Sequence, residues 1–387
     1  MKISVIGPTY PFRGGISQYT SLLVKNLRQQ QDDVQFLSFS RQYPSWLYPG
    51  SSDKDPSSSM ITFEEPDVVF DAINPIAWWN LSKAIWDHKS VLVILPWTVA
   101  YWVPYYYIFL KSLHIHAETQ SLFICHNVFE HESTWLKNRL SRQVLALGNF
   151  FITQSHWDKA NLLNWIGYQR QEQIRVSPHP IYDHLTSASV EKVSARVKLK
   201  LKSERILLFF GFIREYKGLR FLLESIPLIL KHFPIHLIIA GEAWDDVERY
   251  KKIVQTLNLK DKVSFHNHYI PNEDVSNYFV AADLVVVPYT SASQSGIIQL
   301  AYGFQRPVIV SKVGGLPEVV LPEKTGYIVE PGSPSQIANS VIHFFSTGQE
   351  SVMLKHIEAK QKIHSWLEMV KTIKEIGQVS LTKRQLP

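Results

Sequence analysis

Short, uninterrupted apolar runs recur along the chain and constrain its fold more than any other feature. One of them, Ile206–Phe210, reads ILLFF and ends at Gly211. A run of this length without polar alternation is typical of a parallel strand that is buried on both faces. Similar runs follow at His236–Ala240, Val263–Phe265, Leu284–Val287, Val308–Val310 and Gly326–Val329. Because helical patterns fill the intervals, we predict a doubly wound parallel sheet with helices on both faces.

The first half of the chain repeats this alternation. Its apolar runs lie at Ile3–Ile6, Val34–Phe39, Val68–Phe70, Val91–Leu95, Leu122–Cys125, Phe150–Thr153 and Ile174–Ser177. A helix is expected after the first run, with Ser17 as its cap. The fold class is therefore α/β, with two Rossmann-like doubly wound domains. Ligands of such sheets bind at the carboxyl ends of the strands, so we expect the site in a central cleft that both domains face.

Composition along the chain suggests the domain boundaries. Residues 1–183 are predicted to form the N-terminal domain, and residues 205–362 the C-terminal domain. The segment 184–204 is rich in Ser and Lys and lacks a strand pattern, so it is predicted to be the linker. Apolar residues continue on one helical face from Ile357 to Ile376, which predicts a single long helix that packs on the body of the protein.

Overall composition excludes several classes of protein. A chain of 387 residues fits two domains, and 45% apolar with 19% charged residues excludes a disordered or fibrous chain. The net charge is +6, but the basic residues are scattered and no nucleic-acid-binding motif is visible, so no nucleic acid partner is expected. The single cysteine, Cys125, and an N-terminus without a signal-peptide pattern favour a cytoplasmic location.

One stretch requires a comparison with membrane segments. Val91–Leu110 has twenty residues without a charge, which is long enough to span a bilayer. Pro96 and Pro104 interrupt it, however, and its first part resembles another buried strand. A strand followed by a turn and an aromatic-rich helix is the favoured interpretation. The alternatives are a helix that rests on a membrane surface through Trp97, Trp102 and Tyr105–Tyr107, and a transmembrane helix.

A candidate anion site follows the strand at Ile206–Phe210. Arg214 and Lys217 lie three residues apart, where a helix is expected to begin near Gly218. Unpaired N–H groups and the helix dipole attract anions to helix amino-termini. Two cations at such a place indicate a site for a diphosphate. Two solvated surface charges are the alternative interpretation.

Two further segments follow strands of the same half. Tyr289–Gly303, YTSASQSGIIQLAYG, has small residues that let a backbone approach a ligand, and a helix is expected from Gly296. Lys312–Val320, KVGGLPEVV, contains a glycine pair and Glu318, which could accept a hydrogen bond from a sugar hydroxyl or could merely cap a helix. Both segments are expected at the same edge of the sheet as Arg214 and Lys217.

The first half has two candidate segments at strand ends. Phe123–Glu132, FICHNVFEHE, carries His126, His131 and Glu132, which could act in acid–base chemistry or hold hydroxyls. A structural histidine is the alternative, and the spacing does not favour a metal site. Phe12–Ser17, FRGGIS, places two glycines before the first helix. It lacks the glycines of the dinucleotide-binding fingerprint, but such a loop can contact an anion or an acceptor.

Taken together and in this order, these segments resemble glycosyltransferase family 4, the group 1 glycosyl transferases, whose members have the GT-B fold. The resemblance is strongest from Ile206 to Ile337 and weaker in Met1–Gln30 and Phe123–His131. It rests on FFGFIREYKGLRFLLESI, AADLVVVPY, RPVIVSKVGGLPEVV and KTGYIVEPGSPSQIA. In addition, HSWLEMV resembles the family's terminal helix, which implies that residues 363–387 pack back on the N-terminal domain.

The resemblance implies roles for these residues. Arg214 and Lys217 would hold the diphosphate of a nucleotide-sugar donor and stabilise it as a leaving group, since fixed cations stabilise developing charge well. His126 matches the histidine that lies near the transferred sugar, and it completes the implied catalytic set. The implied donor-binding residues are Gly14, Gly15, Gly211, Tyr269, Gln294, Ser295, Gly296, Gln299 and Glu318.

The resemblance also implies a reaction. Members of the family retain the anomeric configuration and need neither a metal nor another cofactor, because the two cations replace the metal. The expected partners are a nucleotide-diphosphate sugar and a glycan or lipid-linked acceptor in polysaccharide or glycoconjugate biosynthesis. A peripheral contact with the inner face of the membrane is a further expectation, motivated by the aromatic stretch at Val91–Leu110.

One departure from the family pattern bears on activity. The family usually carries two glutamates with seven residues between them, but those positions are Ala292 and Leu300 here. Gln294, Ser295 and Gln299 are polar residues nearby that could substitute for them. An active transferase is the favoured interpretation. The alternatives are a catalytically silent GT-B protein that binds a glycan or a partner, and a nucleotide-sugar epimerase of the same fold.

Overall fold

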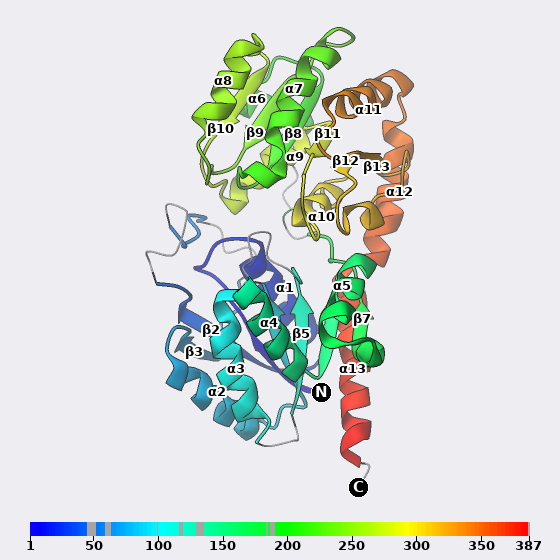
Figure 1. Cartoon of the computed structure of the whole chain (residues 1–387). Coiled ribbons are helices and arrows are strands. Elements are labelled where there is room, and N and C mark those ends of the chain that lie inside the picture. The colour runs from blue at the N-terminus through cyan, green and yellow to red at the C-terminus, as the bar shows by residue number, and fades with distance from the viewer. Residues whose placement is uncertain are drawn as a thin grey trace. The chain divides into compact units, whose positions relative to one another are not determined.

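The computed structural model describes residues 1–44, 52–58, 63–98, 100–115, 119–128, 135–182, 185 and 190–385. The chain divides into two compact units (Figure 1). The first unit comprises Met1–Asp55, Thr62–Pro178 and Ser365–Pro387, and the second comprises Pro56–Ile61 and His179–His364. Each unit is built around one parallel sheet, so the α/β prediction is confirmed.

The first unit contains a seven-stranded sheet in the order β3-β2-β1-β4-β5-β6-β7. The strands are β1 (Lys2–Ile6), β2 (Asp33–Arg41), β3 (Val68–Asp71), β4 (Leu92–Trp97), β5 (Gln120–Cys125), β6 (Phe150–Thr153) and β7 (Ile174–Val176). The helices are α1 (Gly15–Gln29), α2 (Pro75–His88), α3 (Val103–Leu113), α4 (Trp135–Leu147), α5 (His156–Ile166) and α13 (Trp366–Gln385). Helices α2 to α5 pack in a row, and α1 packs against α13. Right-handed crossovers from β4 to β7 place α3, α4 and α5 on one face of the sheet and α1 on the other.

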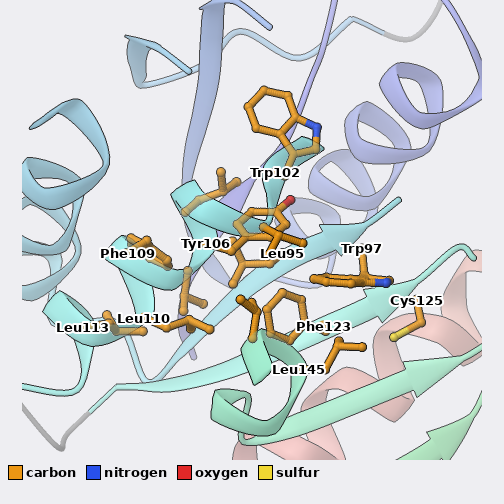
Figure 2. Packing of buried hydrophobic residues seen from close by; sticks show 14 of the residues in the cluster. Leu95, Trp97, Trp102, Tyr106, Phe109, Leu110, Leu113, Phe123, Cys125 and Leu145 are labelled. Atoms are coloured by element: carbon orange, nitrogen blue, oxygen red, sulfur yellow. The ribbon is translucent and has the colours of Figure 1, made fainter. Parts of the chain in front are cut away.

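The aromatic stretch near Pro96 forms part of the core of this unit. Trp97, Trp102 and Tyr106 are 3%, 4% and 2% exposed, and they pack with Phe109 and Phe123 (Figure 2). The Tyr106 hydroxyl donates a hydrogen bond to the Pro96 carbonyl oxygen at 2.6 Å. These side chains lie in the core because β4 and α3 turn them inward, so Trp97, Trp102 and Tyr106 are not available to a membrane surface, whereas Tyr107 of the same stretch is 45% exposed.

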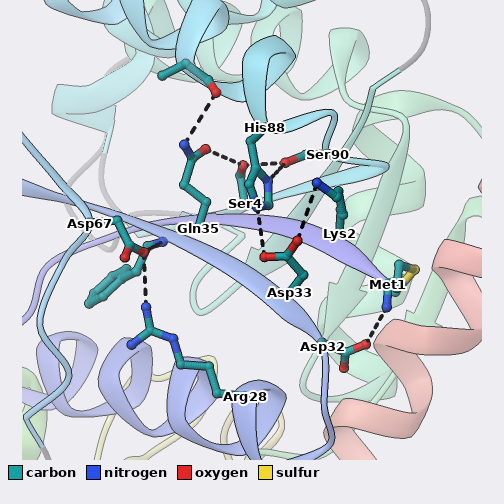
Figure 3. Close-up of polar contacts among 12 residues, drawn as sticks. Met1, Lys2, Ser4, Arg28, Asp32, Asp33, Gln35, Asp67, His88 and Ser90 are labelled. Atoms are coloured by element: carbon teal, nitrogen blue, oxygen red, sulfur yellow. Dashed lines mark hydrogen bonds and ion pairs between the residues drawn. The ribbon is translucent and has the colours of Figure 1, made fainter.

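Polar contacts secure the amino-terminal edge of the same sheet (Figure 3). The terminal ammonium of Met1 pairs with Asp32 at 3.1 Å, and Lys374 of α13 reaches the second oxygen of that carboxylate at 3.2 Å. The Ser4 hydroxyl donates to Gln35 at 3.0 Å and also contacts Ser90. These contacts lie at the opposite end of the strands from the predicted site residues.

The second unit contains a six-stranded sheet in the order β10-β9-β8-β11-β12-β13. The strands are β8 (Ile206–Phe210), β9 (His236–Ala240), β10 (Val263–His266), β11 (Leu284–Val287), β12 (Val308–Ser311) and β13 (Gly326–Val329). The helices are α6 (Lys192–Lys198), α7 (Leu219–Leu230), α8 (Glu248–Thr256), α9 (Asn272–Ala281), α10 (Gly296–Gly303), α11 (Pro334–Thr347) and α12 (Glu350–Ile363). Every apolar run that predicted a strand forms one. The central strands β8, β9, β11 and β12 are almost entirely buried, whereas the edge strand β10 is only partly buried.

The segment that we predicted to be a linker contains α6, which packs against α9 of the second unit. Arg196 donates two hydrogen bonds of 2.9 Å to the Asp283 carboxylate, and Lys192 pairs with the same carboxylate at 2.6 Å. Asp283 also accepts a hydrogen bond from the backbone N–H of Ile206 at 2.7 Å. A polar segment is therefore tied to the start of the first strand of this unit by one buried carboxylate.

Two helix predictions are wrong in detail. Helix α1 begins at Gly15, because Gly14 adopts the N-cap position with φ of 105°, and Ser17 is buried inside the helix rather than capping it. The long helix at Ile357–Ile376 is two helices, α12 and α13. The break lies at His364, and Ser365 accepts a hydrogen bond from the backbone N–H of Glu368 at the new helix start.

Within the part of the chain that the structure describes, no helix combines the length and the apolar character needed to cross a bilayer.

Candidate active site

The cationic part of the predicted site lies where β8 leads into α7. Gly211 follows β8 with φ of 97°, a conformation that L side chains rarely adopt. Arg214 is the N-cap residue of a short 3-10 turn, Glu215–Lys217, and Gly218 with φ of 67° leads into α7. The backbone N–H of Thr290 donates to the Tyr216 carbonyl oxygen at 2.7 Å, which fixes this turn against the end of β11.

Lys217 is a buried cation. The residue is 8% exposed, and its ammonium lies 5.6 Å from the centre of the Tyr289 ring. A Cβ atom added at Gly211 would lie only 3.2 Å from Lys217 Nζ, so the missing side chain makes room for the ammonium. Burial, helped by the positive charge of Arg214, lowers the pKa of Lys217 to about 7. Arg214 is thus the charged residue that acts on the Lys217 ammonium, and its positive charge disfavours the protonated form.

Aromatic side chains from neighbouring strand ends surround Arg214. Its guanidinium lies 5.5 Å from the centre of the Tyr216 ring and 5.7 Å from that of Trp244. The ring of Phe212 lies 4.3 Å from Trp244 at an interplanar angle of 33°, and 6.3 Å from Tyr269. Sequence reasoning named Tyr269 but missed Phe212 and Trp244, because nothing in a lone aromatic residue after a strand indicates that three of them converge.

The loop before α10 supplies the small polar residues. Ser295 is the N-cap of this helix and accepts a hydrogen bond from the backbone N–H of Ile297 at 3.3 Å. Its own hydroxyl lies 3.3 Å from the Tyr289 hydroxyl, which connects the loop to the ring beside Lys217. Gln294 is half-buried in this loop, and Gly296 is the first residue of the helix.

Gln299 is the most unusual residue of α10. It is 2% exposed, and its side-chain oxygen Oε1 is buried without a hydrogen-bond partner among the described residues. A buried polar atom in this state costs about 1 to 3 kcal/mol relative to a satisfied one. The two positions where the family carries glutamates, Ala292 and Leu300, are 5% and 7% exposed. Gln299 is therefore the buried polar residue that is closest in sequence to Leu300, the second of these positions.

The glycine pair after β12 packs against the same loop. Gly314 has φ of 50°, and a Cβ added there would collide with the Ala292 carbonyl oxygen. The backbone N–H of Gly315 donates to the Ser293 carbonyl oxygen at 2.8 Å. Glu318 lies in the following 3-10 turn, Leu316–Val319, with its side chain exposed. The structure thus brings the segments after β8, β11 and β12 together at one edge of the sheet of the second unit.

The candidates of the first unit also share the carboxyl edge of their sheet. Gly14 and Gly15 follow β1 and begin α1, and His126 follows β5 with 6% of its surface exposed. The ring of Tyr19 in α1 stands perpendicular to the His126 ring at 4.6 Å. His131 and Glu132 lie outside the described residues.

Metal ligands do not gather in the described part of either unit. No group of three or more His, Cys, Asp or Glu side chains there is arranged to hold an ion.

Comparison with known proteins connects this geometry to a family. Residues 204–347 match the family model described as Glycosyl transferases group 1. This part of the chain is similar to the group 1 glycosyl transferases. The match covers β8 to α11, which is the segment for which the resemblance was strongest.

Curated relatives match over a similar share of the chain. An uncharacterized glycosyltransferase of Methanocaldococcus jannaschii is 32% identical over 151 residues, which is 38% of each chain. A D-inositol 3-phosphate glycosyltransferase of Corynebacterium diphtheriae is 30% identical over 143 residues, 35% of this chain and 33% of the relative. The matched part spans at most half the length of the first three relatives, at 38%, 43% and 50%.

Solved structures match over nearly the whole chain. HepE of Anabaena, in complex with UDP, aligns with a TM-score of 0.74 over 97% of this chain and 99% of that one, at 16% identity. Sucrose-phosphate synthase of Thermosynechococcus elongatus aligns with a TM-score of 0.71 over 99% of both chains, at 18% identity. The chain therefore has the two-sheet GT-B fold of these proteins, as predicted.

Proposed function

We propose that the protein is a retaining glycosyltransferase that needs no metal and moves a sugar from a nucleotide-diphosphate donor to a glycan or lipid-linked acceptor. The observation that carries this proposal is the buried ammonium of Lys217, which is acted on by the charge of Arg214 and is paired with no carboxylate of the described residues. Burying a charge is costly unless it is paired, so the site is suited to a ligand that brings negative charge. A diphosphate meets this need.

The same two cations suit the chemical step. The bond between the sugar anomeric carbon and the donor diphosphate breaks, a bond from an acceptor hydroxyl oxygen forms on the same face, and the hydroxyl proton passes to the departing diphosphate. Negative charge grows on the diphosphate as this happens. Arg214 and Lys217 are held in place before the reaction, so they stabilise that charge without reorganisation. They supply the charge that a metal ion would otherwise provide.

The remaining residues of the second unit are proposed to hold the donor. The unsatisfied Oε1 of Gln299 is an acceptor for a ribose or sugar hydroxyl, in place of the family's glutamates. Ser295, Gly296 and Gln294 offer a hydroxyl, the N–H groups of a helix start and an amide to the phosphates and the sugar. Glu318 and the backbone at Gly211 are the other residues of this unit that are proposed to contact the donor.

Donor class is proposed from the aromatic group and the comparisons. The ring of Phe212 contacts those of Trp244 and Tyr269 after β8, β9 and β10, and Trp244 lies 5.7 Å from the Arg214 guanidinium, so a nucleobase can stack there. HepE of Anabaena was solved with UDP and with UDP-glucose. UDP-sugars are therefore the first donors to test. In the first unit, Gly14, Gly15 and His126 are proposed to contact the transferred sugar or the acceptor.

A membrane contact is proposed at a surface other than the one expected from sequence. Helix α4 exposes Trp135, Leu136 and Leu140 at 72%, 57% and 41%. It also exposes Lys137, Arg139 and Arg142 and contains no acidic residue. Exposed aromatic and apolar residues interleaved with cations are typical of helices that bind anionic bilayers. This surface fits a protein that works at the inner face of the membrane on a lipid-linked acceptor.

The membrane proposal is tested by flotation with vesicles of anionic or of purely zwitterionic phospholipid. We expect binding to the anionic vesicles, and loss of binding when Trp135, Leu136 and Leu140 are changed to Ser. The matched control changes Ile76 and Trp79, exposed at 68% and 49% on α2, to Ser. Equal flotation of both variants would exclude α4 as the contact.

The transferase proposal is tested by a donor screen with UDP-, GDP- and ADP-sugars, using ligand-observed NMR. Wild type is compared with Lys217→Ala and Arg214→Ala, and with Lys252→Ala as a control at an exposed lysine of α8. We expect one donor class to bind wild type and the control but neither site variant, and to be hydrolysed slowly or transferred when acceptor is added. Unchanged turnover in both site variants would refute the role of these cations.

A silent binding protein is the second candidate, because the buried apolar residues Ala292 and Leu300 occupy the glutamate positions. Donor binding that depends on Lys217, without hydrolysis or transfer to any acceptor, would favour it. A changed free sugar without acceptor would instead indicate an epimerase.

A further inference from the structure

Strand register places His126 beside Gln154 in the first unit. Strands β5 and β6 run parallel, with Cys125 opposite Thr153. His126 directly follows β5 and Gln154 directly follows β6, so both lie at the carboxyl edge of the sheet. Both are buried, with 6% and 3% of their surface exposed. Gln154 has no part in the resemblance or in the proposed donor site.

The contact between the two side chains has a defined direction. Gln154 Nε2 lies 3.4 Å from His126 Nδ1. With the amide in this orientation Gln154 Nε2 donates, so His126 Nδ1 accepts and carries no proton. A neutral imidazole that accepts at Nδ1 carries its single proton on Nε2. The hydrogen bond from Gln154 to Nδ1 thus determines that Nε2 of His126 is a hydrogen-bond donor.

Neighbouring residues hold this pair in place. Ser155 is the N-cap of α5, and its hydroxyl accepts from the backbone N–H of Asp158 and donates to the Asp158 carboxylate at 2.7 Å. Gln154 therefore lies between the end of a strand and a capped helix start. On the other side, the Tyr19 ring stands perpendicular to the imidazole at 90°. Trp366 of α13 packs on Tyr19 in turn, at 5.0 Å.

The other end of the Gln154 amide is unsatisfied. Its oxygen Oε1 is buried without a hydrogen-bond partner among the described residues. This arrangement costs stability, so packing alone does not account for a glutamine here. Leu or Met would fill the same volume without the cost.

We propose that Gln154 is a positioning residue that fixes His126 in the tautomer with its proton on Nε2. The donor of the imidazole is then Nε2, which is buried in this structure and would meet a hydroxyl oxygen of the transferred sugar or the acceptor only once ligand binding opens this surface. The contact with substrate rests on the proposed function, whereas the tautomer does not.

The tautomer of His126 can be measured directly by NMR. Protein labelled with ¹⁵N-histidine is examined by long-range ¹H–¹⁵N correlation, and the His126 signals are assigned by their loss in His126→Gln. We expect a protonated Nε2 and an unprotonated Nδ1 in wild type. In Gln154→Glu the carboxylate can only accept, so the proton must appear on Nδ1, either in the other neutral tautomer or in the imidazolium. Gln171→Glu, at an exposed glutamine of the same unit, is expected to leave the pattern unchanged.

Two results would overturn the proposal. One is a proton on Nδ1 in the wild-type protein, which needs no variant and is therefore independent of any folding defect. The other is a Gln154→Glu protein that folds and keeps the wild-type tautomer. Both can be obtained without turnover, so they are distinct from a failure of the transferase proposal.

Kinetics add a second readout once a donor and an acceptor are known. Gln154→Leu preserves the packing but cannot donate. We expect kcat to fall about tenfold, the loss of one hydrogen bond from the transition state, while the donor KM changes by less than about threefold. A Gln154→Leu enzyme with wild-type kcat would refute the assignment.

Discussion

At the scale of single residues, Lys217 shows how a binding site opposes stability. Its ammonium is buried beside Arg214, and its pKa is lowered to about 7. Folding must therefore either desolvate a positive charge or release a proton near neutral pH. The donor diphosphate would reverse both effects by pairing with the ammonium. A residue of this kind is expected where binding, rather than the fold alone, requires the charge.

The first prediction concerns stability in the absence of donor. The folded pKa of Lys217, about 7, lies below its ordinary value of 10.5. The unfolded chain thus binds more protons between these values, and the contribution of Lys217 to the free energy of unfolding falls as the pH drops from 10.5 to 7. Lys217→Met should therefore raise the unfolding midpoint in urea, most at pH 7 and below and least near pH 10. The control is Lys252→Met. A destabilised Lys217→Met at pH 7 would contradict this account.

The second prediction concerns donor binding and follows from the same pKa. The ammonium form binds the diphosphate, so the affinity for donor should fall about tenfold for each pH unit above 7, until the pKa of the complex is reached. In Lys217→Arg the guanidinium keeps its charge, and this dependence should disappear. Isothermal titration at pH values from 6 to 9 checks both proteins. An equal pH dependence in both would show that another group titrates.

At the scale of elements, glycines at strand ends allow the close approaches that build the donor site. Gly218 is the clearest case, since it has φ of 67° and a Cβ added there would collide with the Pro288 carbonyl oxygen at the end of β11. This contact sets the distance between the turn that carries Lys217 and the loop before α10. Gly348 has a similar φ of 62°, but a Cβ there would meet nothing within 4 Å.

The third prediction uses this pair of glycines. Gly348→Ala should cost only the left-handed backbone conformation, about 1 kcal/mol in the free energy of unfolding. Gly218→Ala should cost about 2 to 4 kcal/mol, because the backbone must also move away from Pro288. Urea unfolding of both variants measures the difference. Equal costs would mean that the contact with Pro288 is easily relieved.

Sequence patterns predicted elements well where the signal is local. Each strand was predicted because continuous apolar runs such as Ile206–Phe210 have one stable environment, a sheet covered on both faces. The break between α12 and α13 was missed although SWLE, from Ser365 to Glu368, is a local signal for a helix start. The apolar stripe across the break was weighted more heavily than that signal.

The residues of the candidate site also divide into those that the sequence predicted and those that it did not. Arg214, Lys217 and the segments after β11 and β12 were predicted together, because parallel strands bring their carboxyl ends to one edge. The group formed by Phe212 and Trp244, and the contact between Gln154 and His126, depend on which strands are neighbours. That order is a property of the sheet, so the lone side chains did not reveal these contacts.

At the scale of the whole molecule, the chain returns to its first unit at its end. The second unit ends at His364, and residues from Ser365 onward belong to the first unit. In the described part of α13 the buried apolar side chains are Trp366, Met369, Val370, Ile373 and Ile376. The first unit thus cannot complete its core until the second has been synthesised. The two units have separate cores, but completion of the first depends on a segment that is synthesised after the second.

The fourth prediction tests this division. Ile373 is fully buried in α13, which packs against α1, so Ile373→Ala should cost about 2 to 5 kcal/mol in the free energy of unfolding. Leu367 in the same helix is 55% exposed, and Leu367→Ala should cost less than about 0.5 kcal/mol.

Hydrogen exchange with mass spectrometry locates the effect. Ile373→Ala should speed exchange in β1 and α1, although these elements lie more than 300 residues away in sequence, and should leave β8 to β13 unchanged. Because local opening reports the stability of the unit that contains it, the two sheets should respond independently. Faster exchange throughout both sheets would mean that the chain unfolds as one cooperative body.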